Sequence, residues 1–240
     1  MSFAALVYEK RDAIAVVTLN RPAALNAINV QLRDDLVQLI PALGIDDDIR
    51  AVVIRGAGRA FCAGADVTEF GTAPSAVAAR WIRRLRPVWH QLAACPKPLI
   101  AAIHGYAIGA GVELAALCDI RVAAAGTLFA VPEVTLGLIP GAGGSQTLPR
   151  LVRPGLALEL LLTGVRIDAE RARTLGLVNR VVAPEQLEAA AEALARRIAA
   201  NPPAAVQAAK RALRGAGDLP LAAGLALERR LLRRLARQGG

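Results

Sequence analysis

Two glutamates inside apolar segments are the residues of this 240-residue chain best suited to chemistry. Glu113 lies in a run of small and aliphatic residues, and Glu133 lies in 128–137, which holds no other charged residue. A buried carboxylate must be ion-paired, hydrogen-bonded or protonated, and burial raises its pKa toward the range used in proton transfer. Either glutamate could instead form a structural salt bridge with Arg121 or Arg150. Two such glutamates beside glycine turns favour an acid–base role.

Turns rich in small residues supply a second kind of group, the free backbone N–H. The turn from Gly105 to Gly111 follows a predicted strand and opens the helix that holds Glu113. N–H groups at a helix start carry partial positive charge and can bind an anion or a developing oxyanion. The turn lacks the third glycine of a dinucleotide-binding fingerprint, so it is weak evidence for NAD. Loops at 59–66 and 137–144 would also let a ligand approach the backbone, although each alone is equally an ordinary turn.

Other site chemistries have less support. His90 and His104 are accompanied by no serine or cysteine nucleophile motif, and no spacing of His, Asp or Glu is typical of a metal site. Cys62, Cys95 and Cys118 are odd in number and scattered, so we expect neither a disulfide framework nor a metal cluster. This cysteine usage favours a reducing compartment and predicts a cytoplasmic protein.

The composition is that of a globular protein, with 55% hydrophobic and 20% charged residues. The net charge of +9 favours acidic partners, but with 3% aromatic residues and no zinc-finger or RNA-recognition signature, nucleic acid is not the expected ligand. The segment 98–118 has the length of a membrane span. Because it contains His104, Glu113 and three glycines, we interpret it as a buried strand followed by a buried helix, and no membrane span is expected.

The hydrophobic patterns predict an α/β protein with a helical C-terminal region. Strands are expected at 6–9, 14–19, 51–55, 99–103, 120–123, 128–131 and 177–182. Helices are expected after the capping residue Asn29, from about 76 to 95, and at 155–162, 168–175, 184–200, 202–213 and 219–237. No linker divides residues 1–240, so we expect one domain, with a core over about 1–183 and a helical region over about 184–240. That region is amphipathic and needs a surface for its leucines, which a neighbouring subunit could provide.

An ordered set of motifs resembles the enoyl-CoA hydratase/isomerase (crotonase) family. The similarity covers roughly residues 5 to 215, and each motif alone is modest whereas the ordered set is highly specific. The matching segments are Leu19-Asn20-Arg21-Pro22 with Leu25-Asn26-Ala27, then Arg59–Asp66, Lys97–Ala102, Gly105–Asp119, Pro132–Gly144, and Thr163-Gly164 through Gly176-Leu177-Val178.

The resemblance implies a crotonase-like spiral of ββα units that assembles as a homotrimer or a dimer of trimers. It implies an acyl-CoA thioester as substrate, with no separate cofactor and no metal, and an oxyanion hole made by the backbone N–H groups of Ala65 and Ala110. By the same match, Glu113 and Glu133 are the catalytic pair that adds water to a 2-enoyl-CoA. Glu133 delivers a proton to Cα and Glu113 activates the water. The residues that the match places around CoA and substrate are Ala24, Ala63, Asp66, Val67, Gly109 and Gly141.

The sequence departs from the family pattern at three places that bear on CoA binding. Ala23 and Thr68 stand where basic residues are common, and the usual C-terminal extension is missing. We therefore expect other cations, such as those of Arg233–Arg237, to meet the CoA phosphates, or weaker phosphate binding. Three alternatives stay open: an isomerase that moves a 3-enoyl double bond from position 3 to position 2, another CoA-thioester lyase or hydrolase of the same fold, and a non-catalytic binder of polyanions. The last rests only on the net charge and the terminal arginines.

Overall fold

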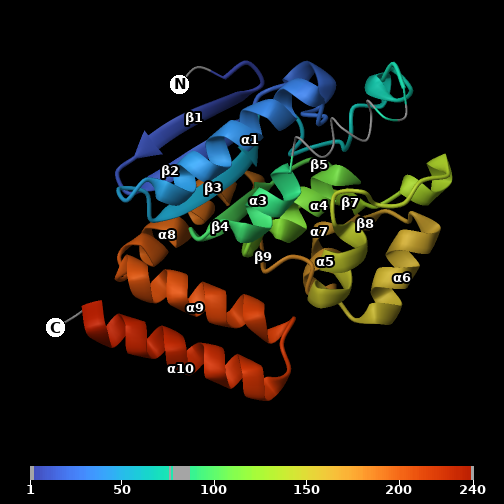
Figure 1. The fold of residues 1–240 in the computed structure, drawn as a ribbon. Coiled ribbons are helices and arrows are strands. Elements are labelled where there is room, and N and C mark those ends of the chain that lie inside the picture. The colour runs from blue at the N-terminus through green and yellow to red at the C-terminus, as the bar shows by residue number, and fades with distance from the viewer. Residues whose placement is uncertain (1–2, 76, 78–86, 239–240) are drawn as a thin grey trace.

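A parallel sheet with one antiparallel edge strand forms the centre of the protein (Figure 1). The computed structural model describes residues 3–75, 77 and 87–238. Six of the described strands lie in the spatial order β1-β2-β3-β4-β6-β9, and within this sheet only β1 pairs antiparallel to its neighbour. Their bounds are β1 Leu6–Arg11, β2 Ile14–Leu19, β3 Ala51–Gly56, β4 Leu99–Ile103, β6 Ile120–Ala124 and β9 Arg180–Val182. This confirms the predicted hairpin at the N-terminus and the α/β class.

Both faces of this sheet are buried, because alternate residues of each central strand enter different apolar clusters. In β4, Leu99, Ala101 and Ile103 join one cluster, whereas Ile100 and Ala102 join the other. Side chains of successive strand residues point to opposite faces, so strands without polar alternation must be covered on both sides. The helices α1 (Val30–Ile45), α3 (Val88–Ala94) and α4 (Ala110–Leu117) contribute to the first cluster, and α8 (Leu187–Ala199) covers the other face. Asn29 caps α1 as predicted, its side chain accepting a hydrogen bond from Leu32 N.

A second, smaller sheet lies beside the first. One of its strands lies within residues 105–111, which the sequence indicates only as a turn with spaced glycines. This sheet orders β5 (Tyr106–Ile108), β7 (Leu128–Ala130) and β8 (Ile167–Asp168) as β5-β7-β8. The prediction of a simple turn over 105–111 was therefore incomplete, since three of its residues form β5. The predicted strand at 177–182 was too long, since only its second half forms β9 (Arg180–Val182). Leu177 and Val178 are instead buried beside the end of α7 (Ala169–Leu175).

The remaining short elements surround the two sheets. These are η1 (Pro22–Ala24), η2 (Val67–Glu69), η3 (Glu133–Leu136), α5 (Gly144–Leu151), α6 (Pro154–Thr163) and η4 (Pro184–Gln186). Of the helix predicted over about 76–95, the described part is α3, which follows Pro87, and the part over 78–86 lies outside the described residues. In the part of the chain that the structure describes, no helix combines the length and apolar character needed to cross a bilayer.

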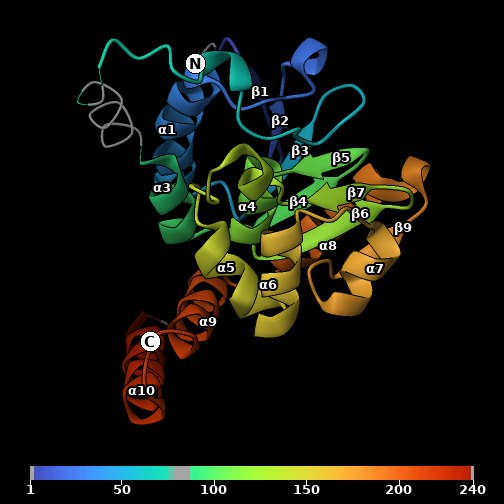
Figure 2. The ribbon, with the colours of Figure 1, turned by 90° about the vertical axis from the view of Figure 1, so that its right-hand side faces the viewer.

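Two helices at the C-terminus, α9 (Pro203–Ala216) and α10 (Leu221–Gln238), pack together and project from the body of the molecule (Figure 2). The carboxylate of Asp119 ties α9 to the body of the molecule. Asp119 pairs with Lys210 (Nζ to Oδ2, 2.6 Å) and with Arg214 (Nη2 to Oδ1, 2.9 Å), and it also accepts the backbone N–H of Leu99. Since α8 packs on the sheet, the helices that stand apart begin at α9, somewhat after the division expected near residue 184.

Candidate active site

Glu113 is held by a turn from a distant part of the chain. It lies in the first turn of α4 with 1% of its surface exposed, and its Oε1 accepts hydrogen bonds from Ala142 N (2.8 Å) and Gly144 N (2.7 Å). A Cβ at Gly144 would be 3.0 Å from that same oxygen, so a glycine lets the backbone come this close. Burial raises the pKa of Glu113, the two N–H donors oppose the rise, and the nearby charge of Glu133 adds to it.

Glu133 is brought to the same place by the small sheet. Gly109 N donates to Ala130 O (2.8 Å), which ties the start of α4 to the end of β7 just before Glu133. The carboxylate then lies over Gly109, where a Cβ would be 2.7 Å from Glu133 Oε1. Its Oε2 is buried and has no hydrogen-bond partner among the described residues. Burial therefore raises the pKa of Glu133.

Neither glutamate forms the structural salt bridge that the sequence left open. Arg121 is buried and donates to the carbonyl oxygens of Leu177 and Cys118, and Arg150 pairs with Asp218 at the surface. In the described part of the chain, no cation lies within salt-bridge distance of either site carboxylate. Two close carboxylates without a counter-ion repel each other when both are charged, so one of them keeps a proton more readily than an exposed carboxylate does. This arrangement suits proton transfer.

The two predicted oxyanion donors lie on loops that touch. The loop after β3 joins β5 through Cys62 N to Tyr106 O and Ile108 N to Cys62 O, each 3.0 Å. A Cβ at Gly64 would be 3.9 Å from Ala110 N, so the loops meet beside both donors. Ala110 is the first residue of α4, where an N–H has no acceptor within the helix. Among the described residues, neither Ala65 N nor Ala110 N donates a hydrogen bond.

The residues expected around CoA and substrate gather on the same loops. Ala63 and Asp66 flank the Gly64–Ala65 step, and the exposed Val67 starts η2. Ala24 ends η1, which leads into the segment that pairs with this loop. Gly109 lies under Glu133, and Gly141 directly precedes the donor Ala142. These placements bring the predicted residues together, and their roles stay a prediction.

Sequence reasoning missed the backbone donors that hold Glu113. The sequence indicates the loop at 137–144 as an ordinary turn or one that a ligand can approach, whereas in the structure its N–H groups donate to Glu113 because α5 packs against α4. Sequence reasoning also assigned no role to Arg21 and Asn26 beyond their place in the family motif. Arg21 Nη1 donates to Asp66 Oδ2 (2.9 Å), and the fully buried Asn26 side chain bonds three backbone groups.

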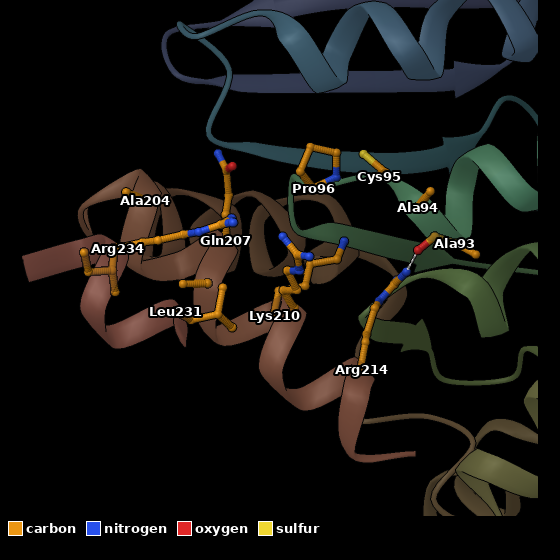
Figure 3. Close-up of a pocket in the computed structure, with 13 residues that line it drawn as sticks. Ala93, Ala94, Cys95, Pro96, Ala204, Gln207, Lys210, Arg214, Leu231 and Arg234 are labelled. Carbon is orange, nitrogen blue, oxygen red and sulfur yellow. Dashed lines mark hydrogen bonds between the residues drawn. The ribbon is translucent and has the colours of Figure 1, made fainter. Parts of the chain in front are cut away.

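A pocket of about 530 Å³ lies away from these residues, between the end of α3 and the helices α9 and α10 (Figure 3). Lys210, Arg214 and Arg234 line it together with apolar side chains, and Arg214 donates to Ala93 O there. It contains neither of the two glutamates, nor any residue predicted for the oxyanion hole or the substrate loops. Arg234, one of the terminal arginines expected to meet the CoA phosphates, thus lies in this pocket beside α9.

The described residues offer no other obvious catalytic group. They contain no cluster of three or more His, Cys, Asp or Glu suited to a metal ion. Burial raises the pKa of the Cys62 and Cys118 thiols to about 12 each, so both are protonated at neutral pH and are poor nucleophiles. The two carboxylates and the N–H groups of Ala65 and Ala110 are therefore the candidate catalytic groups.

Comparison with known proteins agrees with this geometry. The family model described as enoyl-CoA hydratase/isomerase matches residues 9–239. A 2,3-dehydroadipyl-CoA hydratase of Escherichia coli K12 is 44% identical over 96% of this chain and 90% of its own length, and a short-chain-enoyl-CoA hydratase of Clostridium acetobutylicum is 39% identical over 93% and 86%. The crystal structure of an enoyl-CoA hydratase from Bacillus anthracis superposes with a TM-score of 0.91 at 36% identity, covering 96% of this chain and 90% of that one, which confirms the crotonase-like fold. The chain belongs to the enoyl-CoA hydratase/isomerase family.

Proposed function

We propose that this protein hydrates 2-enoyl-CoA thioesters, with Glu113 and Glu133 as its two catalytic carboxylates. The observation that carries the proposal is the unequal hydrogen bonding of the pair. Two backbone N–H groups donate to Glu113 and oppose the rise in its pKa, whereas Glu133 has a buried oxygen without a partner among the described residues. Hydrogen bonds to a carboxylate favour ionisation, and an unsatisfied buried oxygen favours protonation. This difference makes Glu113 the better base of the pair and Glu133 the better acid.

The reaction follows from these two states. A water between the carboxylates gives a proton to Glu113 as its oxygen bonds to Cβ of the substrate. The π electrons move onto the thioester oxygen, where the N–H groups of Ala65 and Ala110 stabilise the enolate by about 3–4 kcal/mol per donor, as in comparable oxyanion holes. As the enolate collapses, Glu133 gives its proton to Cα. The product is a 3-hydroxyacyl-CoA, and the proton returns from Glu113 to Glu133 through solvent. Coenzyme A enters as part of the substrate, and no separate cofactor takes part.

Product analysis on matched substrates tests this function. We expect crotonyl-CoA to be converted to 3-hydroxybutyryl-CoA with loss of the enoyl absorbance, and a 3-enoyl-CoA to react much more slowly. The panel should include a carboxylate-terminated 2-enoyl-CoA beside unsubstituted short chains, because relatives are named for both kinds of substrate. Rapid conversion of 3-enoyl to 2-enoyl-CoA without hydration would instead indicate the isomerase. Salt-sensitive binding of polyanions without any turnover would indicate a non-catalytic binder.

The pH dependence of kcat/KM should be bell-shaped. Catalysis needs a single proton on the pair, so activity falls at low pH when Glu113 becomes protonated and at high pH when Glu133 loses its proton. Burial raises both pKa values, so both limbs should lie above the ordinary glutamate value of 4.5. Initial rates at subsaturating substrate between about pH 4 and pH 10 measure this profile. A rate that stays constant from about pH 5 upward would contradict the acid role of Glu133.

The oligomeric state, the cellular location and the metabolic role of the enzyme form part of the same proposal. We expect a homotrimer or a dimer of trimers, supported by the leucines Leu213, Leu221 and Leu232, which α9 and α10 leave exposed. Three free cysteines fit a cytoplasmic protein, and acyl-CoA substrates fit a place in fatty acid or other lipid metabolism. Sedimentation velocity of the purified protein measures the assembly.

A further inference from the structure

The loop that carries Ala65 is held by a segment that belongs to neither sheet. Residues 21–28 follow β2 and lie against residues 57–66, which follow β3. Ala63 N donates to Leu25 O (3.0 Å), Ile28 N to Gly64 O (2.7 Å), and Asp66 N to Ile28 O (3.1 Å). In this parallel pairing, Ile28 bonds the residues before and after Ala65. The N–H of Ala65 itself is therefore directed away from the segment, free to meet a ligand.

Asn26 locks this segment in place. Its buried side chain donates from Nδ2 to Ala57 O (2.8 Å) and Ala60 O (2.7 Å), and its Oδ1 accepts from Arg21 N (2.9 Å). Its backbone has φ +57°, in the left-handed region that asparagine tolerates better than most residues. One side chain thus fixes both the turn and the first half of the loop.

An ion pair fixes the other half of the loop. Arg21 Nη1 bonds Ala27 O (2.5 Å) and Asp66 Oδ2 (2.9 Å), while Asp66 Oδ1 accepts from Thr68. The Thr68 hydroxyl and the Arg21 guanidinium lower the pKa of Asp66 and keep it charged. The carboxylate of Asp66 is therefore engaged within the protein, directly beside Ala65.

We propose that Asn26, supported by the Arg21–Asp66 pair, is a positioning residue that aims the Ala65 N–H at the substrate thioester oxygen. The Ala110 donor belongs to a helix end anchored by β5 and β7, whereas the Ala65 donor has no sheet or helix of its own. Its direction depends on bonds from the 21–28 segment. This inference rests on the proposed role of Ala65 in the oxyanion hole.

The test replaces Asn26 and measures both turnover and oxyanion stabilisation. Asn26→Gly keeps the left-handed backbone accessible and removes only the side-chain amide. We expect kcat to fall about 10- to 100-fold with KM changed little, because a small misplacement of a transition-state donor acts on kcat. The second readout is acetoacetyl-CoA, whose ionisation to an enolate is followed by its ultraviolet absorbance. The wild-type site should lower the apparent pKa of this bound ligand, and Asn26→Gly should lower it less.

Controls separate positioning from stability. Asp35→Asn changes another buried side chain, which accepts a hydrogen bond from Ala5 N (2.7 Å) just before β1, and it should leave kcat unchanged even where thermal stability falls. Glu133→Gln should lose turnover yet still lower the pKa of bound acetoacetyl-CoA. Where Asn26→Gly fails to fold, Arg21→Lys takes its place with the same expected direction.

Each result bears on a different claim. If the wild-type enzyme hydrates enoyl-CoA and stabilises the enolate, and Asn26→Gly does both equally well, the positioning role is wrong and the proposed function stands. A loss confined to KM with an unchanged enolate pKa also overturns it. If the wild-type enzyme itself leaves the pKa of the bound ligand unchanged, the oxyanion role of Ala65 fails, and the inference fails with it.

Discussion

Replacing Glu133 with glutamine should lower kcat for hydration by about 10²- to 10⁴-fold, the range that a positioned general acid contributes. Glutamine keeps the size of the side chain but cannot give a proton to Cα. The Glu113→Gln variant should show a loss in the same range, because an amide cannot accept the proton of the attacking water. Steady-state kinetics on crotonyl-CoA, with substrate affinity measured separately, give both values. Binding should change little, since neither substitution removes the N–H groups of Ala65 and Ala110 that are expected to meet the thioester oxygen.

An exposed glutamate provides the matched control. Glu185→Gln in η4 makes the same chemical change at the surface, and it should leave kcat within about twofold, as is usual for surface substitutions away from a site. Circular dichroism and thermal unfolding establish that each variant is folded. Wild-type turnover in both Glu113→Gln and Glu133→Gln would exclude the two-carboxylate mechanism, whatever the other substitutions do.

Adding one methyl group at Gly109 should also abolish most activity. Gly109 has φ +50°, and a Cβ there would lie 2.7 Å from Glu133 Oε1. Gly109→Ala must therefore move the carboxylate or the start of α4, and both changes displace reacting groups. We expect a loss in kcat of about 10²-fold or more, because displacement by about 1 Å has that effect on positioned groups. Backbone strain should in addition destabilise the fold by about 1–3 kcal/mol.

A matched substitution at Gly126 separates the effect of backbone strain from the effect of the contact with Glu133. It also has a positive φ, +81°, but a Cβ there would meet nothing within 4 Å. Gly126→Ala should therefore lose a similar amount of stability and retain nearly full activity. Denaturant unfolding and kcat measured on both variants decide the matter, and equal activity of the two would show that Glu133 does not depend on the space above Gly109.

Local patterns predicted most of the elements, because they depend on neighbouring residues. Asn29 caps α1, and the apolar runs become the strands of the main sheet. The small elements β5 and η3 were missed, since three or four residues carry too little periodicity, and β5 exists only through pairing with β7 and the loop after β3. The position of α8 was also not predictable, because an amphipathic helix does not indicate which surface it will cover.

The sequence predicted which residues form the candidate site but not the hydrogen bonds that hold them. Apolar surroundings identified Glu113 and Glu133, and the resemblance identified Ala65 and Ala110. Nothing local shows that Ala142 and Gly144 donate to Glu113, because the bond spans 29 residues or more and depends on how α5 packs on α4. The same holds for Asn26, two of whose three backbone partners lie 31 and 34 residues away.

The buried pair of glutamates also sets a limit on engineering. A glutamate with a raised pKa adds no penalty to the folded state below its ordinary value of 4.5, and the penalty grows as pH rises through the raised pKa. At neutral pH, which is above 4.5, the folded enzyme already carries part of this penalty. A library screened for heat resistance alone would therefore accumulate neutral residues at 113 and 133 and yield robust but inactive proteins. Selection for durability in this enzyme has to include turnover at every round.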